Sequence, residues 1–234
     1  MIASIHQPNH LPPLGFFHKM KQSDVFVILD TAQYVKNDYH NRNRIRTPQG
    51  STWLTIPIPS KDCYQKRINE VPLPEDKTWA KKHLKSMELS YGKAPYFNEY
   101  IEFFREIYGN PPKMLVDLNV KIIKFLKDSL GIKTKLMMAS EMNIDPSLRS
   151  IDMLIEILKK VGATEYISGK GRAHQGKGTY IDEEDIKKFQ DAGIKLRWHE
   201  FTHPEYPQPF PGFEKHMAAI DALFMLGPKA KELI

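Results

Sequence analysis

The residues best suited to chemistry lie near the start of the chain, where two histidines flank a proline-containing loop. His6 and His10 are four residues apart, and Gln7 and Asn9 lie beside them. Imidazole titrates near pH 6.5 and suits proton transfer, and the free N–H groups of the following helix can receive an anion. We predict His6 or His10 as a general base, with Gln7, Asn9 and His18 contacting substrate. The alternative is that one of these histidines only bonds carbonyl groups in a rigid loop.

Three more acid and base residues follow later strand-like runs. Asp30 ends an apolar run, where it could act as a base or accept a hydroxyl group, although a strand-end Asp also caps turns. His203 and Glu205, in a proline-rich tract, could form an acid/base or hydroxyl-binding pair. Asp221 lies beside the apolar face of the last predicted helix, and we expect it to be a buried carboxylate that anchors this tract.

Two polar segments, residues 41–44 and residues 168–172, could hold an anionic or hydroxyl-rich ligand. Arginine donates two parallel hydrogen bonds to phosphate, asparagine binds hydroxyl and amide groups, and glycines between cations let the backbone approach a ligand. The second segment lacks the spacing of a P-loop. The alternative for the first segment is a solvated rim of the hairpin, and the alternative for the second is a simple turn. The predicted ligand contacts are Asn41, Arg42, Asn43, Arg44, Ser168, Lys170 and Arg172.

No metal site is predicted. The chain has nine histidines but no HxH spacing, and Cys63 is the single cysteine, so paired-cysteine metal spacing is absent from the sequence. One cysteine excludes an internal disulfide, which suits a reducing cytosol.

The elements that must position these residues alternate between strands and helices. Predicted strands at 2–6, 24–30, 133–139, 165–168 and 195–201 are joined by helices that include 16–21, 151–161 and 183–192. This alternation predicts an α/β fold with a doubly wound, mostly parallel five-stranded sheet. We expect one domain over residues 1–234, with a β-hairpin insertion at 31–60 and a helical segment at 77–130. Such sheets bind ligands at the carboxyl ends of their strands, where the polar loops should converge.

The composition limits the class of protein. The 234 residues are 41% hydrophobic, which supplies a substantial core. We expect no membrane insertion, since charges interrupt every apolar stretch, and the start of the chain has no readable export signal. A cytoplasmic location follows. The net charge of +6 favours anionic partners such as nucleotides or sugar phosphates. The sequence does not predict the oligomeric state.

Several ordered motifs resemble the WbqC-like protein family over nearly the whole chain. They include the run from His6 to Lys19, Asn41-Arg42-Asn43-Arg44-Ile45, Tyr166-Ile167-Ser168-Gly169-Lys170-Gly171 and His203-Pro204-Glu205-Tyr206-Pro207-Gln208. The resemblance implies a role in making surface polysaccharide such as O-antigen. It carries over no catalytic assignment, so the residue roles above come from the chemistry of the residues.

A second resemblance is to the nucleotidyltransferase-like superfamily. Pro8-Asn9-His10 after the first strand is similar to its Pro-x-His segment, and Ile167-Ser168 before Lys170 resembles its second signature. The superfamily expects Gly-His shortly after the first histidine, whereas this chain has Pro12-Pro13. The likeness therefore supports the fold and nucleotide binding more than adenylyl transfer.

These observations lead to one principal hypothesis and two alternatives. The principal hypothesis is a transferase that passes an acyl or aminoacyl group to the amine or hydroxyl of a nucleotide-linked or lipid-linked sugar. Its donor would be an acyl thioester. The first alternative is a nucleotidyltransferase that uses a nucleoside triphosphate with Mg²⁺. The second is a non-enzymatic nucleic-acid binder, which is disfavoured because no recognition motif is present.

Overall fold

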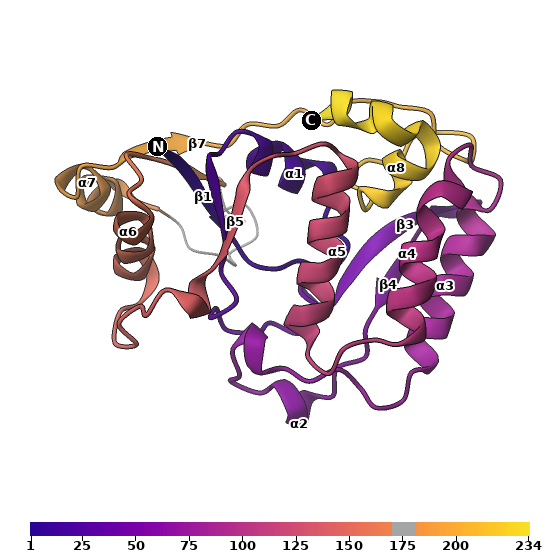
Figure 1. Cartoon of the computed structure of the whole chain (residues 1–234), viewed down its shortest axis with the longest axis horizontal. Helices are drawn as coiled ribbons and strands as arrows, with labels where there is room; N and C mark the ends of the chain where they lie inside the picture. The colour runs from indigo at the N-terminus through magenta and orange to yellow at the C-terminus, as the bar shows by residue number, and fades with distance from the viewer. Residues whose placement is uncertain (170–180) are drawn as a thin grey trace. The chain divides into compact units, whose positions relative to one another are not determined.

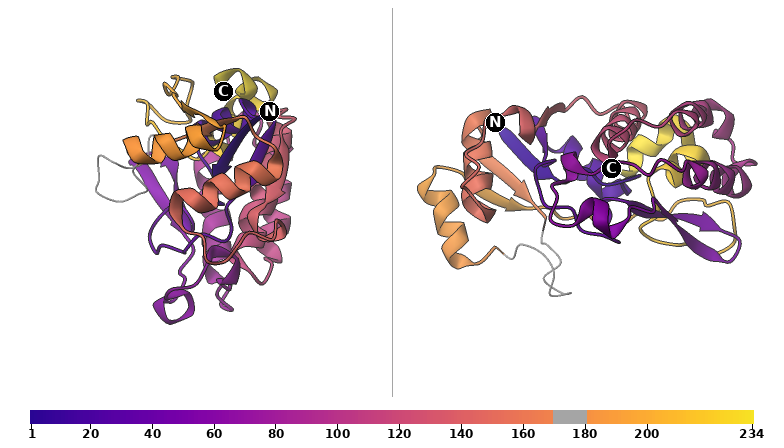
Figure 2. Two further views of the ribbon diagram at one scale, coloured as in Figure 1. Left: turned by 90° about the vertical axis from the view of Figure 1, so that its left-hand side faces the viewer. Right: turned by 90° about the horizontal axis from the view of Figure 1, so that it is seen from below.

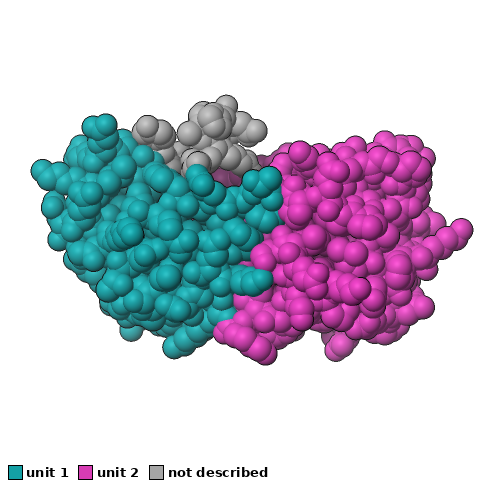
Figure 3. Space-filling model, turned by 90° about the horizontal axis from the view of Figure 1, so that it is seen from above, with its two compact units in different colours: residues 1–7, 18–30, 134–202 teal, residues 8–17, 31–133, 203–234 magenta. Residues whose placement is uncertain are grey.

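The structure is a computed structural model of the chain, and it describes residues 1–169 and 181–234. These residues form two compact units that alternate along the sequence (Figure 3). Unit 1 comprises residues 1–7, 18–30 and 134–202. Unit 2 comprises residues 8–17, 31–133 and 203–234. The chain passes from unit 2 back to unit 1 within helix α1 (Leu14–Lys21).

A five-stranded sheet forms the centre of unit 1, and all of its pairings are parallel. The second strand is a continuous apolar run whose four residues are all buried, as in parallel sheets covered on both faces. This sheet confirms the predicted fold class. The strands are β1 (Ile2–His6), β2 (Val25–Ile28), β5 (Lys135–Met138), β6 (Glu165–Ser168) and β7 (Lys195–Trp198).

The strand order is β5-β2-β1-β6-β7, so the chain builds the sheet outward from β1 in both directions (Figure 1). Ile5 pairs in register with Val27, and Ser4 pairs with both Phe26 and Ile167. Between β1 and β6 the direction of winding reverses. In doubly wound sheets this reversal leaves a crevice outside the carboxyl ends of the two strands.

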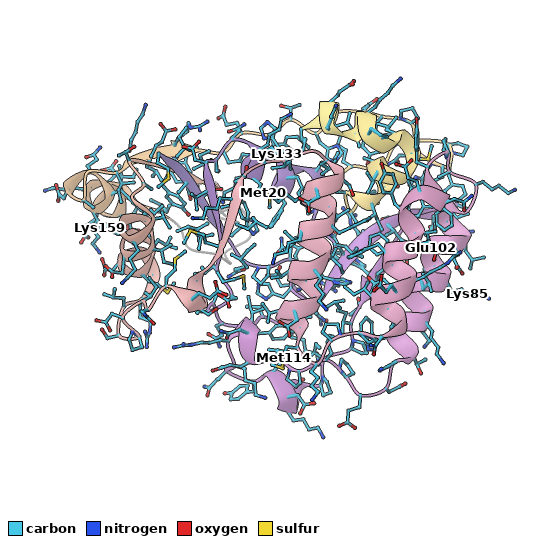
Figure 4. The ribbon with its side chains drawn as sticks, in the orientation of Figure 1. Met20, Lys85, Glu102, Met114, Lys133 and Lys159 are labelled. Carbon is cyan, nitrogen blue, oxygen red and sulfur yellow. The ribbon has the colours of Figure 1, made fainter. Side chains whose placement is uncertain are left out.

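Helices α6 (Ser150–Val161) and α7 (Glu183–Asp191) contact each other and pack on β1 and β7 respectively (Figure 2). The buried face of α6 carries an apolar stripe that includes Ile151, Ile155 and Leu158, and the helix matches the one predicted over 151–161. Gly162 ends the helix with a φ of 72°, a left-handed conformation that glycine adopts without strain. Lys159 lies on the exposed side (Figure 4). A short 3-10 helix, η2 (Ala139–Glu141), follows β5.

The last strand is shorter than the sequence predicts. The apolar pattern extends the strand to Phe201, but β7 ends at Trp198. The reason is that, among residues 1–169 and 181–234, β7 pairs with β6 alone, and Trp198 lies opposite Ser168, the last residue of β6. The strand therefore ends where its hydrogen-bonding partner ends.

Unit 2 combines the predicted hairpin with a helical segment. Strands β3 (Arg42–Thr47) and β4 (Gly50–Thr55) pair antiparallel around a turn at Pro48-Gln49. Charged side chains such as Lys85 and Glu102 lie on the outside of the helices (Figure 4). The helices are α2 (Ser60–Cys63), η1 (Ile68–Glu70), α3 (Thr78–Tyr91), α4 (Phe97–Gly109), α5 (Leu115–Ser129), α8 (Ile220–Leu226) and η4 (Gly227–Leu233).

A buried polar network ties the proline-rich tract to the core of unit 2. The Tyr91 hydroxyl donates to Asp221 Oδ1 at 2.7 Å and accepts from the Arg46 backbone N–H at 2.9 Å. The Gln208 side chain donates to Asp221 Oδ2 at 3.0 Å and to the Glu214 carbonyl at 3.0 Å. Asp221 is fully buried, and burial raises its pKa. The expected anchoring role of Asp221 is confirmed.

Replacing Tyr91 with phenylalanine should lower the free energy of unfolding by about 1–3 kcal/mol, because a buried N–H and a buried carboxylate each lose a partner. Urea titration measures this change. Tyr64→Phe is the matched control, since Tyr64 is 76% exposed, and it should be neutral. Equal stability of Tyr91→Phe and Tyr64→Phe would show that the network contributes nothing.

Candidate functional site

A cavity of about 270 Å³ lies in unit 1 at the carboxyl ends of β1 and β6. This is the point where the winding of the sheet reverses, which is the general ligand-binding position of doubly wound sheets. His6 and Gln7 at the end of β1, and Ser168 and Gly169 at the end of β6, line the cavity. The remaining lining residues are Ile5, Lys19, Leu29, Ser150, Met153, Leu154, Tyr166 and Ile181. We call this space the switch-point cavity.

The imidazole of His6 is held in one tautomer. Its Nδ1 lies 3.0 Å from the Gln7 carbonyl oxygen, and a carbonyl can only accept, so Nδ1 carries the hydrogen. In the neutral ring Nε2 then carries the lone pair that can take a proton. The ring also stacks on Phe26, with 6.5 Å between centroids. His6 therefore has the tautomer that a general base needs.

Lys19 is the cation in the wall of this cavity. It lies on α1, its side chain is buried, and its Nζ donates to the Ile5 carbonyl at 2.8 Å. Burial lowers the pKa of Lys19 from 10.5 to about 7. No carboxylate among residues 1–169 and 181–234 forms an ion pair with Lys19. The amine is thus poised between its charged and neutral forms near neutral pH.

Two other predicted residues of unit 1 lie outside the cavity lining. Asp30 is buried, and its Oδ1 accepts from the Ser140 backbone N–H at 3.0 Å at the start of η2, so it caps a turn. His18 Nδ1 lies 2.8 Å from His199 Nε2, and its ring packs on Phe201 at 4.9 Å. Burial is the main cause of the lowered pKa of His18.

His10 lies in the core of unit 2. Its side chain is fully buried, its Nδ1 is 3.0 Å from Asn119 Oδ1, and its ring centroid is 5.7 Å from that of His83. Burial and the nearby His83 lower the pKa of His10 to about 3, and burial lowers that of His83 to about 4. Both rings are neutral at pH 7. The enclosure of His10 counts against the base role predicted for it and favours the structural alternative.

The hairpin separates its amide and guanidinium groups by strand alternation. Asn43 faces the core and donates to the Leu11 carbonyl at 2.5 Å, and the buried Asn41 donates to the Ile56 carbonyl at 2.8 Å. Arg42 and Arg44 point to the other face, where their guanidinium carbons lie 4.3 and 5.7 Å from the centre of the Trp53 ring. The amides therefore hold the loop, and the arginines and Trp53 form a partly exposed cationic face.

The remaining predicted residues are placed as follows. His203 is buried among aromatic rings, with Phe213 at 5.8 Å and His216 at 5.3 Å, and burial lowers its pKa. Glu205 is exposed, and Asn9 is buried in the loop after β1. All of these belong to unit 2. Lys170 and Arg172 lie outside the described residues.

Three predicted residues, His6, Gln7 and Ser168, thus come together in one cavity, and Lys19 is the residue that the sequence interpretation missed. Lysine is rarely buried in proteins, so a lysine is normally interpreted as a surface residue. A signal was present, since Lys19 follows the aromatic Phe16 by three residues. This spacing places its side chain on the apolar face of the helix.

A family model described as the WbqC-like protein family matches residues 7–233. The chain belongs to the WbqC-like protein family. It is also similar to the uncharacterized protein Rv1507c of Mycobacterium tuberculosis, with 30% identity over 234 residues that cover 99% of this chain and 96% of that protein. No solved structure matches the chain.

Within the part of the chain that the structure describes, no helix is both long and apolar enough to cross a bilayer.

The two buried histidines of unit 2 predict a specific loss of stability in acid. Their folded pKa values lie below the unfolded value of 6.5. Unfolding therefore takes up protons below about pH 6.5, and the stabilisation present above that pH falls as the pH drops toward 4. Each histidine contributes up to about 1.4 kcal/mol per pH unit.

NMR titration of the histidine rings measures this directly. We expect the His10 and His83 resonances to remain those of neutral rings down to pH 4.5, while resonances of less buried histidines move. Titration of either ring with a midpoint near 6.5 would contradict the enclosure. In His83→Gln, urea titrations should show a pH dependence smaller by about one proton.

Proposed function

We propose that the protein is a transferase that acts on a nucleotide-linked or lipid-linked sugar in surface polysaccharide biosynthesis, with the switch-point cavity as its active site. The observation that carries the proposal is the convergence of His6, Lys19 and Ser168 at the reversal point of the sheet. The role that membership of the WbqC-like family implies, in making polysaccharides such as O-antigen, supports the choice of substrate class.

The proposed reaction is transfer of an acyl or aminoacyl group from a thioester to a sugar amine or hydroxyl. His6 Nε2 takes the proton of the acceptor as its nitrogen or oxygen attacks the acyl carbon. The new bond to the acyl carbon forms, the carbon–sulfur bond breaks, and the proton passes to the departing thiolate. The Gln7 carbonyl stabilises the imidazolium that exists between these steps, because it accepts from Nδ1.

The partly exposed face formed by Arg42, Arg44 and Trp53 in unit 2 suits a ligand that carries a phosphate and a sugar or base. Planar guanidinium groups bind phosphate with two parallel hydrogen bonds, and an aromatic ring stacks on a sugar or base. Arg42, Arg44, Lys170 and Arg172 stay proposed phosphate contacts, and Glu205 and His203 proposed hydroxyl contacts. Asp30 caps a turn, which makes it a support for the region after β2 in this proposal.

The test uses purified protein, a panel of nucleotide-linked amino sugars and a panel of acyl and aminoacyl thioesters, with products identified by mass spectrometry. We expect transfer by the wild type and a loss of about 100- to 10,000-fold in kcat for His6→Gln, since that is the usual contribution of a general base. His216→Gln is the control, because His216 lies outside the cavity lining.

Equal turnover by wild type and His6→Gln would remove His6 as the base. Absence of transfer together with Mg²⁺-dependent release of pyrophosphate from a nucleoside triphosphate would replace acyl transfer with nucleotidyl transfer.

A further inference from the structure

A lysine in the wall of a cavity raises the question of its counter-ion. Moving an ammonium group out of water costs several kcal/mol unless an opposite charge compensates. Lys19 is 4% exposed. The Lys19 Nζ donates a hydrogen bond to a neutral group, the Ile5 carbonyl. Within the described residues, the Lys19 ammonium therefore has the dipole of a carbonyl group as its partner and no anion.

The other titratable groups around Lys19 do not supply the negative charge. His6 of β1 and Tyr166 of β6 line the same cavity, and burial raises the pKa of Tyr166 to about 12, so its phenol is neutral. His199, after β7, interacts electrostatically with Lys19 and has a pKa lowered to about 4, mainly by burial. His18 and Lys21 share the helix with Lys19, and neither is acidic.

The rest of the cavity lining suits a small oxyanion. At the end of β6 the Ser168 hydroxyl donates to the Gly169 carbonyl at 3.2 Å, Gly169 brings a backbone without a side chain to the cavity, and Ser150 begins α6 at the same cavity. A volume of about 270 Å³ corresponds to about nine water molecules at about 30 Å³ each. That is enough for a phosphate group and part of a sugar.

We propose that the switch-point cavity binds a tetrahedral oxyanion, such as the phosphate of a sugar phosphate or nucleotide, directly on the Lys19 ammonium, and that Lys19 takes up a proton as the anion binds. The inference rests on the proposed function only for the location of the site, and it requires no group transfer. An anion supplies the missing countercharge, so its binding favours the charged form of the amine. Binding and protonation of Lys19 must then strengthen each other.

Sulfate is the probe for the test, because it is tetrahedral and keeps its charge at pH 7–10. The affinity is measured by following backbone amide resonances of the cavity residues at pH 7, 8 and 9. Since free Lys19 titrates at about 7, the affinity of the wild type should fall about tenfold between pH 8 and pH 9.

Three variants separate the charge of Lys19 from its titration. Lys19→Arg should bind sulfate with little dependence on pH over this range, because arginine stays charged. Lys19→Met should lose the binding. Lys21→Met is the matched control on the same helix, since Lys21 is exposed, and it should behave as the wild type does.

One measurement on the wild type keeps the test valid if the Lys19 variants fail to fold. The Cε resonance of Lys19 should titrate near pH 7 in the free protein and at a higher pH with sulfate present. An unchanged titration at saturating sulfate would overturn the proposal. So would sulfate affinity of Lys19→Met equal to that of the wild type, or tighter binding of acetate than of sulfate.

Failure of this test is distinguishable from failure of the proposed function. Sulfate binding that depends on Lys19 supports the anion site even if every thioester panel is inactive. If the protein catalyses acyl transfer but Lys19→Met binds sulfate as tightly as the wild type does, the transferase is supported and the anion site is overturned.

Discussion

Strand β1 lies between β2 and β6, and this central position is the constraint on which the site depends. The winding of the sheet reverses beside β1, and the switch-point cavity lies at the carboxyl ends of β1 and β6. The Lys19 Nζ reaches back from α1 to the Ile5 carbonyl and fixes the side chain at that edge. The backbone of β1 therefore positions both His6, the proposed base, and Lys19.

The two units use histidine in opposite ways. In unit 2, His10 and His83 are enclosed by aromatic and amide groups and remain neutral because burial lowers their pKa values. In unit 1, His6 lines a cavity, and a backbone carbonyl selects its tautomer. The same residue type thus serves packing in unit 2 and lines a cavity in unit 1, and this access to a cavity is why the chemical role is proposed for His6 and not for His10.

Much of the fold could be predicted from the sequence, because burial repeats with the period of each element. The apolar run before Asp30 and the stripe on α6 each identify one element, and the alternation of elements gives a parallel sheet. The site could be predicted only in part. Asn43 and Arg44 are neighbours in an equally polar segment, yet strand alternation turns Asn43 into the core and Arg44 outward. That distinction depends on which hairpin face is covered, and a local pattern does not contain it. Lys19 is hidden for a related reason, since its burial depends on tertiary contacts.

The most direct measurement is a crystal structure of the protein with a nucleotide diphosphate sugar bound. We expect density for a phosphate group in the switch-point cavity, within hydrogen-bonding distance of Lys19 Nζ and beside Ser168, with the sugar facing His6. Density for the diphosphate on Arg42 and Arg44 at the Trp53 face, with no ligand group in the cavity, would contradict the placement of the active site.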